Sequence, residues 1–201
     1  MTKSLLVLIL ALIGIFITDQ AIKEYMILKA MDIYALPQEA LYNRALDIYE
    51  TACINLRLVF NQGVAFSMLS FLDEYLKWLQ LLLISVVLAY VISLRKLCYM
   101  LPSGILIGAG LSNVYDRFIH GGVVDYLFWH CGFDFAIFNF ADVMIDFAVV
   151  WLLAITALFL MTSNFLRPPG GAEGYIVTVT GEPADALLTI GNVSQRPYDD
   201  G

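Results

Sequence analysis

The sequence has few charged residues, and this shortage excludes most soluble proteins. Only 14% of its 201 residues are charged and 60% are apolar, against about 25% and about 45–50% in soluble domains. The mean hydropathy of +0.78 agrees with this imbalance. The 18 acidic residues outnumber the 11 basic ones, giving a net charge of −7, which argues against a nucleic-acid partner because such proteins are basic. We therefore expect an integral membrane protein.

Cysteine and histidine are also scarce, which removes several kinds of site. Cys53, Cys98 and Cys131 lie far apart without a C-x-x-C pair, which excludes a disulfide-dense secreted scaffold and a recognisable zinc site. His120 and His130 lack partners at metal-binding spacing, and we expect them at the surface. The sequence contains no G-x-S-x-G, phosphate-loop or H-E-x-x-H motif. Cys131 beside His130 leaves a thiol nucleophile as a minor alternative.

Four apolar segments are long enough to cross a membrane as helices, since about 20 residues span the hydrocarbon core. They cover about residues 4–22, 76–94, 97–115 and 143–161. The third is interrupted by Pro102, Ser103 and Gly104. We expect the first to remain as an anchor, because neither a small-x-small cleavage site nor a lipidation cysteine follows it. The predicted fold class is therefore an all-α membrane protein with four transmembrane helices.

The basic residues predict how the chain is oriented. Lys3 precedes the first span and Arg167 follows the fourth. Arg95 and Lys96 occupy the turn between the second and third spans. The positive-inside rule then places both termini and that turn in the cytoplasm. We therefore expect the long loop of about residues 24–74 on the outer side of the membrane, although its own basic residues dilute the signal.

This outer loop contains regular patterns. Pro37 can open a helix, and several later apolar residues recur at helical spacing: Leu41, Ala45, Ile48 and Tyr49. The stretch 55–60 is β-branched, aromatic and leucine-rich and ends at Asn61-Gln62-Gly63, which predicts a strand entering a turn. We expect an amphipathic helix and a small periplasmic β-sheet on the membrane surface. An ordinary folded loop without a role is the alternative.

The composition changes after Leu166. Residues 167–171 are a cluster of helix-breaking Pro and Gly, and residues 172–201 are polar and acidic. We therefore divide the chain into a membrane domain, residues 1–166, and a cytoplasmic tail, residues 167–201. In the tail, residues 175–180 and 187–190 either pair as a weak hairpin or belong to a disordered segment.

Aspartates gather at the outer ends of the predicted spans: Asp19, Asp116, Asp125 and Asp142. An Asp at the centre of a membrane helix costs about 2.5–3.5 kcal/mol on insertion scales. Each therefore needs a partner, a water-filled cavity or a chemical role. Asp19 with Lys23, four residues apart, and Asp116 with Arg117 can be explained as structural ion pairs.

Asp125 and Asp142 suggest chemistry instead. The 16 residues between them are enough to bring them side by side. Two carboxylates about 4 Å apart repel by roughly 4 kcal/mol at an effective dielectric constant of 20, so that one keeps a proton near neutral pH. Such a pair can activate water for attack on a carbonyl. Asp146, one turn beyond Asp142, is expected beside this site or in a contact between helices.

Five motifs then occur in an order that resembles one enzyme family. They are Thr18-Asp19-Gln20-Ala21-Ile22-Lys23, Asn61-Gln62-Gly63-Val64-Ala65-Phe66-Ser67, Gly108-Ala109-Gly110-Leu111-Ser112-Asn113-Val114-Tyr115-Asp116-Arg117, Gly122-Val123-Val124-Asp125-Tyr126 and Phe138-Asn139-Phe140-Ala141-Asp142. Over about residues 5–163 the chain resembles lipoprotein signal peptidase (signal peptidase II), a family of bacterial inner-membrane aspartyl peptidases. The resemblance implies removal of signal peptides from diacylglyceryl-modified prolipoproteins, just before the lipidated cysteine, without a metal or other cofactor.

The resemblance also implies roles for individual residues. Asp125 and Asp142 would be the catalytic pair. Supporting or substrate-binding positions would be Asn61, Gly63, Asn113, Arg117 and Asn139, and structural polar positions would be Asp19, Lys23 and Asp116. The site would lie near the periplasmic face of the inner membrane, with prolipoproteins and membrane lipids as partners, and we expect a monomer. Two departures are the long segment from Asp19 to Asn61 and the extra charge of Asp146.

Two other functions stay open at this point. A small proton- or ion-coupled transporter would also use intramembrane carboxylates, but it predicts acids near the bilayer centre and discontinuous helices. A relative without catalytic activity would bind lipidated peptides only. The presence of both aspartates counts against that alternative.

Overall fold

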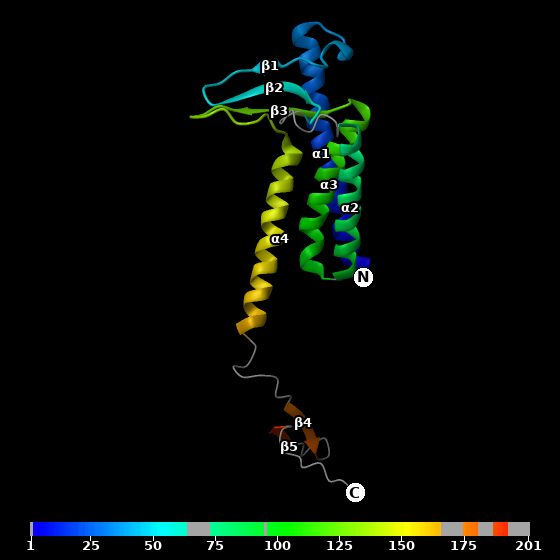
Figure 1. The fold of residues 1–201 in the computed structure, drawn as a ribbon, viewed down its shortest axis with the longest axis vertical. Coiled ribbons are helices and arrows are strands. Elements are labelled where there is room, and N and C mark those ends of the chain that lie inside the picture. The colour runs from blue at the N-terminus through cyan, green and yellow to red at the C-terminus, as the bar shows by residue number, and fades with distance from the viewer. Residues whose placement is uncertain (1, 64–72, 95, 166–174, 181–186, 193–201) are drawn as a thin grey trace. The chain divides into compact units, whose positions relative to one another are not determined.

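The computed structural model describes residues 2–63, 73–94, 96–165, 175–180 and 187–192. It has two compact units, residues 1–156 and 157–201. The helices are α1 (Thr2–Tyr34), α2 (Asp73–Leu94), α3 (Leu97–Ile119) and α4 (Phe140–Phe165). All four are long and apolar enough to cross a membrane, and Figure 1 shows them as the main elements of the fold. The predicted class, a four-helix membrane protein with a small sheet, is confirmed.

The first helix is much longer than the predicted span. We expected it to end near residue 22, and α1 continues to Tyr34. Beyond the polar segment at Asp19, apolar side chains of Met26, Ile27 and Ala30 continue at helical spacing and are buried in the main core. Burial against the sheet therefore extends the helix past the point where hydropathy alone would end it, and the outer loop begins at residue 35, not 24.

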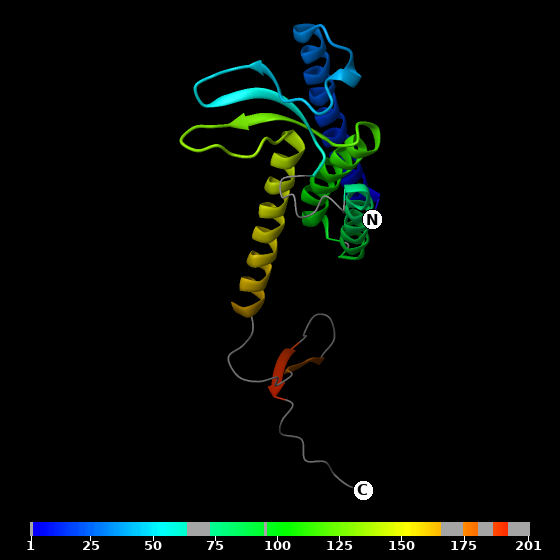
Figure 2. The same cartoon turned by 45° about the horizontal axis from the view of Figure 1, so that its top comes forward.

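Small residues bring α1 and α3 into close contact. A Cβ atom added to Gly104 would lie 2.5 Å from the Leu8 carbonyl oxygen, and one added to Gly108 would lie 2.5 Å from that of Leu12. Glycines four residues apart are the usual device for close approach of membrane helices. Helix α3 also packs against α2, and the three helices lie side by side in Figures 1 and 2.

A three-stranded antiparallel sheet packs against the last turns of α1, in the order β1 (Leu46–Tyr49), β2 (Ile54–Asn61), β3 (Val123–Trp129). The strand expected at residues 55–60 is therefore confirmed. In the β2–β3 register Asn61 is opposite Val123 and Val59 is opposite Asp125. Figures 1 and 2 show the sheet crossing the end at which α4 begins. This register brings Asn61 close to Asp125.

The prediction of an amphipathic helix in the outer loop is wrong. Only a short 3₁₀ helix, η1 (Gln38–Ala40), forms there, and Leu46 to Tyr49 belong to strand β1. Asn43 has a positive φ of 64°, which interrupts any continuous helix. Leu41 lies before this break and Leu46 lies after it, and both side chains are buried in the main core. Burial against the sheet therefore decides the structure of this segment, although its apolar residues have helical spacing.

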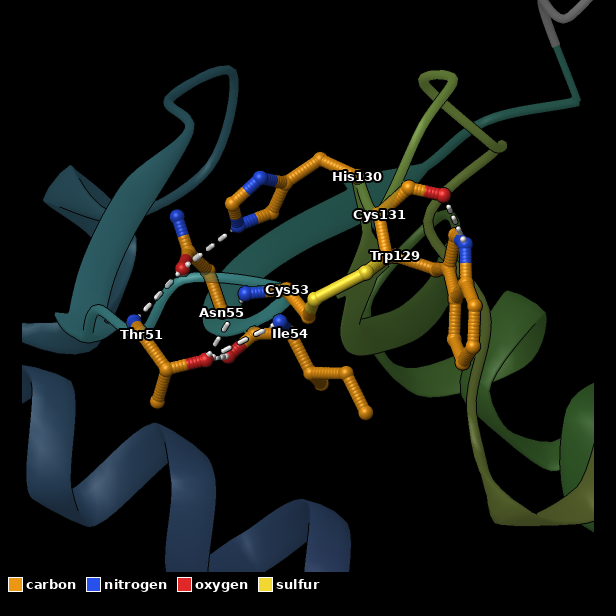
Figure 3. Close-up of a disulfide and its surroundings, with 7 residues drawn as sticks. All are labelled: Thr51, Cys53, Ile54, Asn55, Trp129, His130 and Cys131. Carbon is orange, nitrogen blue, oxygen red and sulfur yellow. Dashed lines mark hydrogen bonds between the residues drawn. A yellow bond between two sulfur atoms is a disulfide. The ribbon is translucent and has the colours of Figure 1, made fainter.

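A disulfide joins Cys53, just before β2, to Cys131, just after β3 (Figure 3). The sequence did not predict it, because the two cysteines are 78 residues apart and the sheet alone brings them together. The pairing removes the thiol nucleophile considered for Cys131. His130 is half-buried, and its Nε2 lies 3.0 Å from Asn55 Oδ1. This contact joins the end of β3 to the start of β2.

The second unit contains a two-stranded antiparallel hairpin, β4 (Tyr175–Thr180) and β5 (Leu187–Asn192). This agrees with the hairpin alternative for the two segments named in the sequence. Five consecutive β-branched residues in β4, residues 176–180, favour the extended conformation. The other tail residues on which the disordered alternative depends lie outside the described ranges.

Candidate active site

Helix α4 begins with a reciprocal cap that fixes Asp142. The Asp142 backbone N–H donates to Asn139 Oδ1 at 3.0 Å, and the Asn139 backbone N–H donates to Asp142 Oδ2 at 3.1 Å. This is the capping-box arrangement, in which the residue before the helix and the third helical residue satisfy each other. Asn113 Nδ2 of α3 donates to the other oxygen, Asp142 Oδ1, at 2.9 Å. The carboxylate is therefore held from two elements.

Asp125 is held in the same manner from strand β3. Its side chain is 2% exposed. Asn61 Nδ2 donates to Oδ2 at 2.8 Å, and Asn139 Nδ2 donates to Oδ1 at 2.7 Å. One residue, Asn139, thus contacts both aspartates through opposite ends of its amide. The structure therefore brings Asp125 and Asp142 together, as expected from the sequence.

A buried ion cluster lies behind this pair. Lys23 Nζ lies 2.6 Å from Asp19 Oδ2 and 2.7 Å from Asp116 Oδ2, and it donates to Asn113 Oδ1 at 2.8 Å. Lys23 is 1% exposed and both acids are fully buried. A buried charge is costly unless it is paired and hydrogen-bonded, and this Lys satisfies three acceptors. Its bond to Asn113 orients the amide so that Nδ2 faces Asp142.

The two acids of this cluster also tie the surrounding elements together. Asp19 Oδ1 accepts the backbone N–H of Ala141 in the first turn of α4 at 2.9 Å, and Asp116 Oδ2 accepts the backbone N–H of Val124 in β3 at 3.1 Å. These bonds fix the starts of the two segments that carry Asp142 and Asp125. The expected pair of Asp19 with Lys23 is present. Asp116 was expected to pair with Arg117, and the structure pairs it with Lys23, because α1 and α3 lie side by side at this level.

Sequence reasoning assigned no role to three residues that complete the cluster. Gln20 Nε2 donates to Asp116 Oδ1 at 2.7 Å and to Ser112 Oγ at 2.8 Å, and Ser112 Oγ donates to Asp19 Oδ2 at 2.6 Å. The Tyr126 hydroxyl accepts the backbone N–H of Phe140 at 3.1 Å. The available signal was their place inside the motifs, because Gln20, Ser112 and Tyr126 lie within four residues of Asp19, Asp116 and Asp125, respectively.

The remaining expected site residues lie around this centre. Gly63 has a positive φ of 93°, and its backbone N–H donates to Asn61 Oδ1 at 2.9 Å, so that glycine permits the turn that orients Asn61. Arg117 is half-buried in the last turn of α3. Asp146 is exposed one turn beyond Asp142. Within the described ranges, no three His, Cys, Asp or Glu side chains form a group that could hold a metal ion.

Burial changes the acidity of groups near the site. It raises the pKa of Asp125 from 3.8 to about 7, because removing the carboxylate from water outweighs the hydrogen bonds from Asn61 and Asn139, and the charge of Asp142 adds to the rise. Burial also raises the pKa of Tyr126 and lowers that of His120. Asp125 therefore holds a proton over much of the neutral range, as one member of an acid–base pair requires.

A family model described as signal peptidase (SPase) II matches residues 11–159 of this chain. The chain belongs to the signal peptidase II family. The matched residues contain the complete cluster from Asp19 to Asp142, so the family match and the polar centre coincide. The resemblance noted in the sequence is thereby confirmed, and the chain is an aspartic peptidase of this family.

Curated relatives agree with the family assignment. The chain is 52% identical over 153 residues to the lipoprotein signal peptidase of Sulfurimonas denitrificans, covering 76% of this chain and 89% of that protein. It is 49% identical to the lipoprotein signal peptidase of Sulfurovum sp. and 47% identical to that of Helicobacter pylori, covering 78% and 82% of this chain and 97% and 96% of the two relatives.

A solved structure has the same fold. It is described as a bacterial membrane enzyme determined in meso at 2.3 Å resolution, and it covers 83% of this chain and 94% of its own with a TM-score of 0.55 at 22% identity. This similarity concerns the fold alone.

Proposed function

We propose that this signal peptidase II uses Asp125 and Asp142 to remove signal peptides from diacylglyceryl-modified prolipoproteins, cutting just before the lipidated cysteine. The observation that carries the proposal is the shared contact of both carboxyl groups with Asn139, whose side-chain Nδ2 donates to Asp125 Oδ1 and whose backbone N–H donates to Asp142 Oδ2. Two acids held together by neutral amides can divide one proton between them, and this allows general acid and general base catalysis in one site.

In this mechanism Asp125 is the acid and Asp142 the base. Asp125 has a pKa of about 7 because it is buried, so about half of the molecules carry this proton at pH 7. Asp142 lies in the first turn of α4, where the helix N-terminus favours a negative charge. Asp142 takes a proton from water as the water oxygen attacks the scissile carbonyl carbon, and Asp125 protonates the carbonyl oxygen.

Collapse of the tetrahedral intermediate returns both groups to their starting states. The proton held by Asp142 passes to the leaving amine nitrogen as the carbon–nitrogen bond breaks. Asp125 recovers its proton from a hydroxyl of the intermediate as the carboxylic acid product forms. Asn61, Asn113 and Asn139 orient the two carboxyl groups through the bonds described above and are positioning residues in this proposal, with Gly63 and Arg117 as supporting positions.

We also propose that the site lies at the periplasmic face of the bacterial inner membrane and that both termini are cytoplasmic. Three observations support this placement. The basic residues flank the expected cytoplasmic ends, the acids gather at one end of the helices, and the disulfide beside the sheet is typical of an oxidising compartment. The membrane domain is then residues 1–166, a monomer in contact with lipids, followed by a cytoplasmic tail.

A direct test measures cleavage of a diacylglyceryl-modified prolipoprotein by the purified protein in detergent. We expect the variants Asp125→Asn and Asp142→Asn each to lose at least about 10³-fold in rate, because each removes one proton-transfer group. Asp134→Asn is the matched control, since this exposed Asp lies in the loop between the two and is expected to cleave like the parent chain. Full activity in either dyad variant would contradict the assignment.

A further inference from the structure

His120 is half-buried at the end of α3, where we expected a surface position. Its backbone N–H donates to the Asp116 carbonyl oxygen at 2.7 Å and closes the helix. Gly121 follows with a positive φ of 72°, the usual conformation just after a helix end. His120 therefore occupies the junction between α3 and β3, the strand that carries Asp125.

Three side chains from other parts of the chain surround the His120 ring. Two of them belong to the outer segment, residues 35–45, which connects α1 to β1. Gln38 Nε2 lies 3.3 Å and Tyr42 Oη 3.2 Å from His120 Nδ1. Phe60 of β2 packs edge-on against His120 at 5.7 Å and against Tyr42 at 4.6 Å between ring centroids. These four residues, the His120 cluster, join the outer segment to β2 and to the end of α3.

The polar contacts of the cluster require an unprotonated Nδ1. The amide nitrogen of Gln38 can only donate, and a neutral imidazole offers one ring nitrogen as an acceptor. Burial lowers the pKa of His120 below its ordinary 6.5 and outweighs Asp116 of α3 and Glu24 of α1, whose charges favour the proton. Lys23 of α1 acts in the same direction as burial. The ring is therefore predominantly neutral at pH 7 and can accept.

The His120 cluster lies beside Asn61, which holds Asp125. Phe60 precedes Asn61 in β2, and a Cβ atom added to Gly122 would lie 3.0 Å from the Asn61 carbonyl oxygen. The turn after His120 thus lies against the Asn61 backbone without room for a side chain. Asn61 Nδ2 donates to Asp125 Oδ2 at 2.8 Å. The cluster and the glycine turn therefore set the position of the amide that orients the proposed acid.

We propose that His120 is a positioning residue for the catalytic pair. Its unprotonated Nδ1 holds the outer segment against Phe60 and the glycine turn, so that Asn61 stays aligned on Asp125, and protonation of His120 releases this contact. The inference rests on the proposed function. It also gives a role to the long segment from Asp19 to Asn61, since a segment that only connected α1 to β1 would need no such contacts with a half-buried imidazole.

The test measures kcat and KM for a diacylglyceryl-modified prolipoprotein from pH 5 to 9, with the full chain in detergent. His120→Phe keeps a ring but has no acceptor, and we expect kcat to fall about tenfold with KM nearly unchanged, as for one lost hydrogen bond away from the substrate. The bond from Asn61 lowers the pKa of Asp125, so weakening it should move the alkaline limb of kcat/KM to higher pH. A residue that serves stability alone would leave this limb in place.

His120→Asn tests the titration. Its Oδ1 offers an acceptor near the place of Nδ1 but takes up no proton in this pH range. We expect most of the lost kcat to return, and the fall of kcat/KM below about pH 6.5 to be less steep than in the parent chain, which gains a proton at His120. If His120→Asn loses as much kcat as His120→Phe, or keeps the acid limb of the parent, the acceptor does not position the pair and the proposal is wrong.

Tyr42→Phe removes one hydroxyl from the cluster and keeps its ring, so it remains informative if the His120 variants do not fold. We expect kcat to fall about threefold, and the double variant with His120→Phe to fall no further than His120→Phe alone, because both changes break the same contact. Tyr34→Phe is the matched control. This exposed hydroxyl donates to the Asp47 carbonyl oxygen of β1, and its loss should leave kcat unchanged. A parent-like Tyr42→Phe, or additive losses in the double variant, would overturn the proposal.

A measurement without substrate separates failure of this inference from failure of the proposed function. The chain has two histidines, and nitrogen NMR of the imidazole rings in detergent, assigned with His130→Gln, reports which ring nitrogen carries the proton. At pH 7 we expect the proton of His120 on Nε2, and Tyr42→Phe should shift its Nδ1 resonance. A proton on Nδ1 would overturn the inference while the catalytic pair stands. If Asp125→Asn and Asp142→Asn still cleave, the proposed function itself fails.

Discussion

Asn139 performs two tasks that are separable by substitution. Its Oδ1 caps α4 through the Asp142 backbone N–H, and its Nδ2 donates to Asp125. A neutral amide suits this place because it offers an acceptor on one side and donors on the other. An Asp or a Ser here could still cap the helix, but neither could supply the amide donor. The residue thus couples the start of a helix to the proposed chemistry.

This coupling predicts different outcomes for two variants of Asn139. Asn139→Ala removes the cap and the donor, so both stability and activity should fall, stability by about 1 kcal/mol and kcat by roughly 10- to 100-fold. Asn139→Ser keeps a capping oxygen and should recover most of the stability but not the activity. Thermal unfolding in detergent and cleavage rates measure the two effects. Recovery of activity in Asn139→Ser would contradict the role of the amide.

The buried Asp125 predicts a pH dependence of stability. Its pKa is about 7 in the folded chain, against 3.8 ordinarily, so the folded chain binds this proton more tightly than the unfolded chain. The stabilisation is complete below pH about 4 and is lost as the pH rises through 7, by up to about 4 kcal/mol. Unfolding of the parent chain measured from pH 4 to 8 should show this fall, and Asp125→Asn should show a flatter curve. Parallel curves would contradict the raised pKa.

At the scale of elements, the long apolar segments predict the fold better than the loops do. Spans and the strand β2 follow from hydropathy and β-branched residues, which act locally. The extension of α1 to Tyr34 and the strand β1 cannot be predicted from local sequence. Both depend on burial against the sheet, whose strands are distant from one another in the sequence. The pairing of Cys53 with Cys131 has the same origin. That Asp125 and Asp142 lie close together could be predicted from their motifs, whereas the bonds of Gln20 to Asp116 and of Ser112 to Asp19 could not, because they join α1 to α3.

The contact of α1 with α3 predicts a contrast between two glycines. Gly108→Ala places a methyl group 2.5 Å from the Leu12 carbonyl oxygen, so the helices must separate, at a cost of about 1–3 kcal/mol. Gly14→Ala has nothing within 4 Å of the new atom and should leave stability unchanged or raise it by up to about 1 kcal/mol. Unfolding temperatures of the two variants in the same detergent measure the contrast. Equal values would contradict the close packing.

At the scale of the whole molecule, polar and apolar material are separated along the helices. One end of the bundle contains the ion cluster, the two aspartates and the sheet, whereas the remaining helix surfaces expose large apolar side chains. Such surfaces suit lipid, and the concentration of acids at one end does not fit the row of midplane carboxylates that a transporter would need. The ion cluster, the two aspartates and the sheet therefore lie together at one end of the helices.

The link between Cys53 and Cys131 makes the intervening chain a covalent ring that contains α2 and α3. A protease that cuts once between residues 64 and 72 would therefore leave two pieces still joined. The nicked protein should migrate as one band without reductant and as two bands after dithiothreitol, whereas Cys53→Ser should give two bands in both conditions. A single cut in this stretch would then be invisible on a non-reducing gel, and the severed enzyme would be retained as a single molecule.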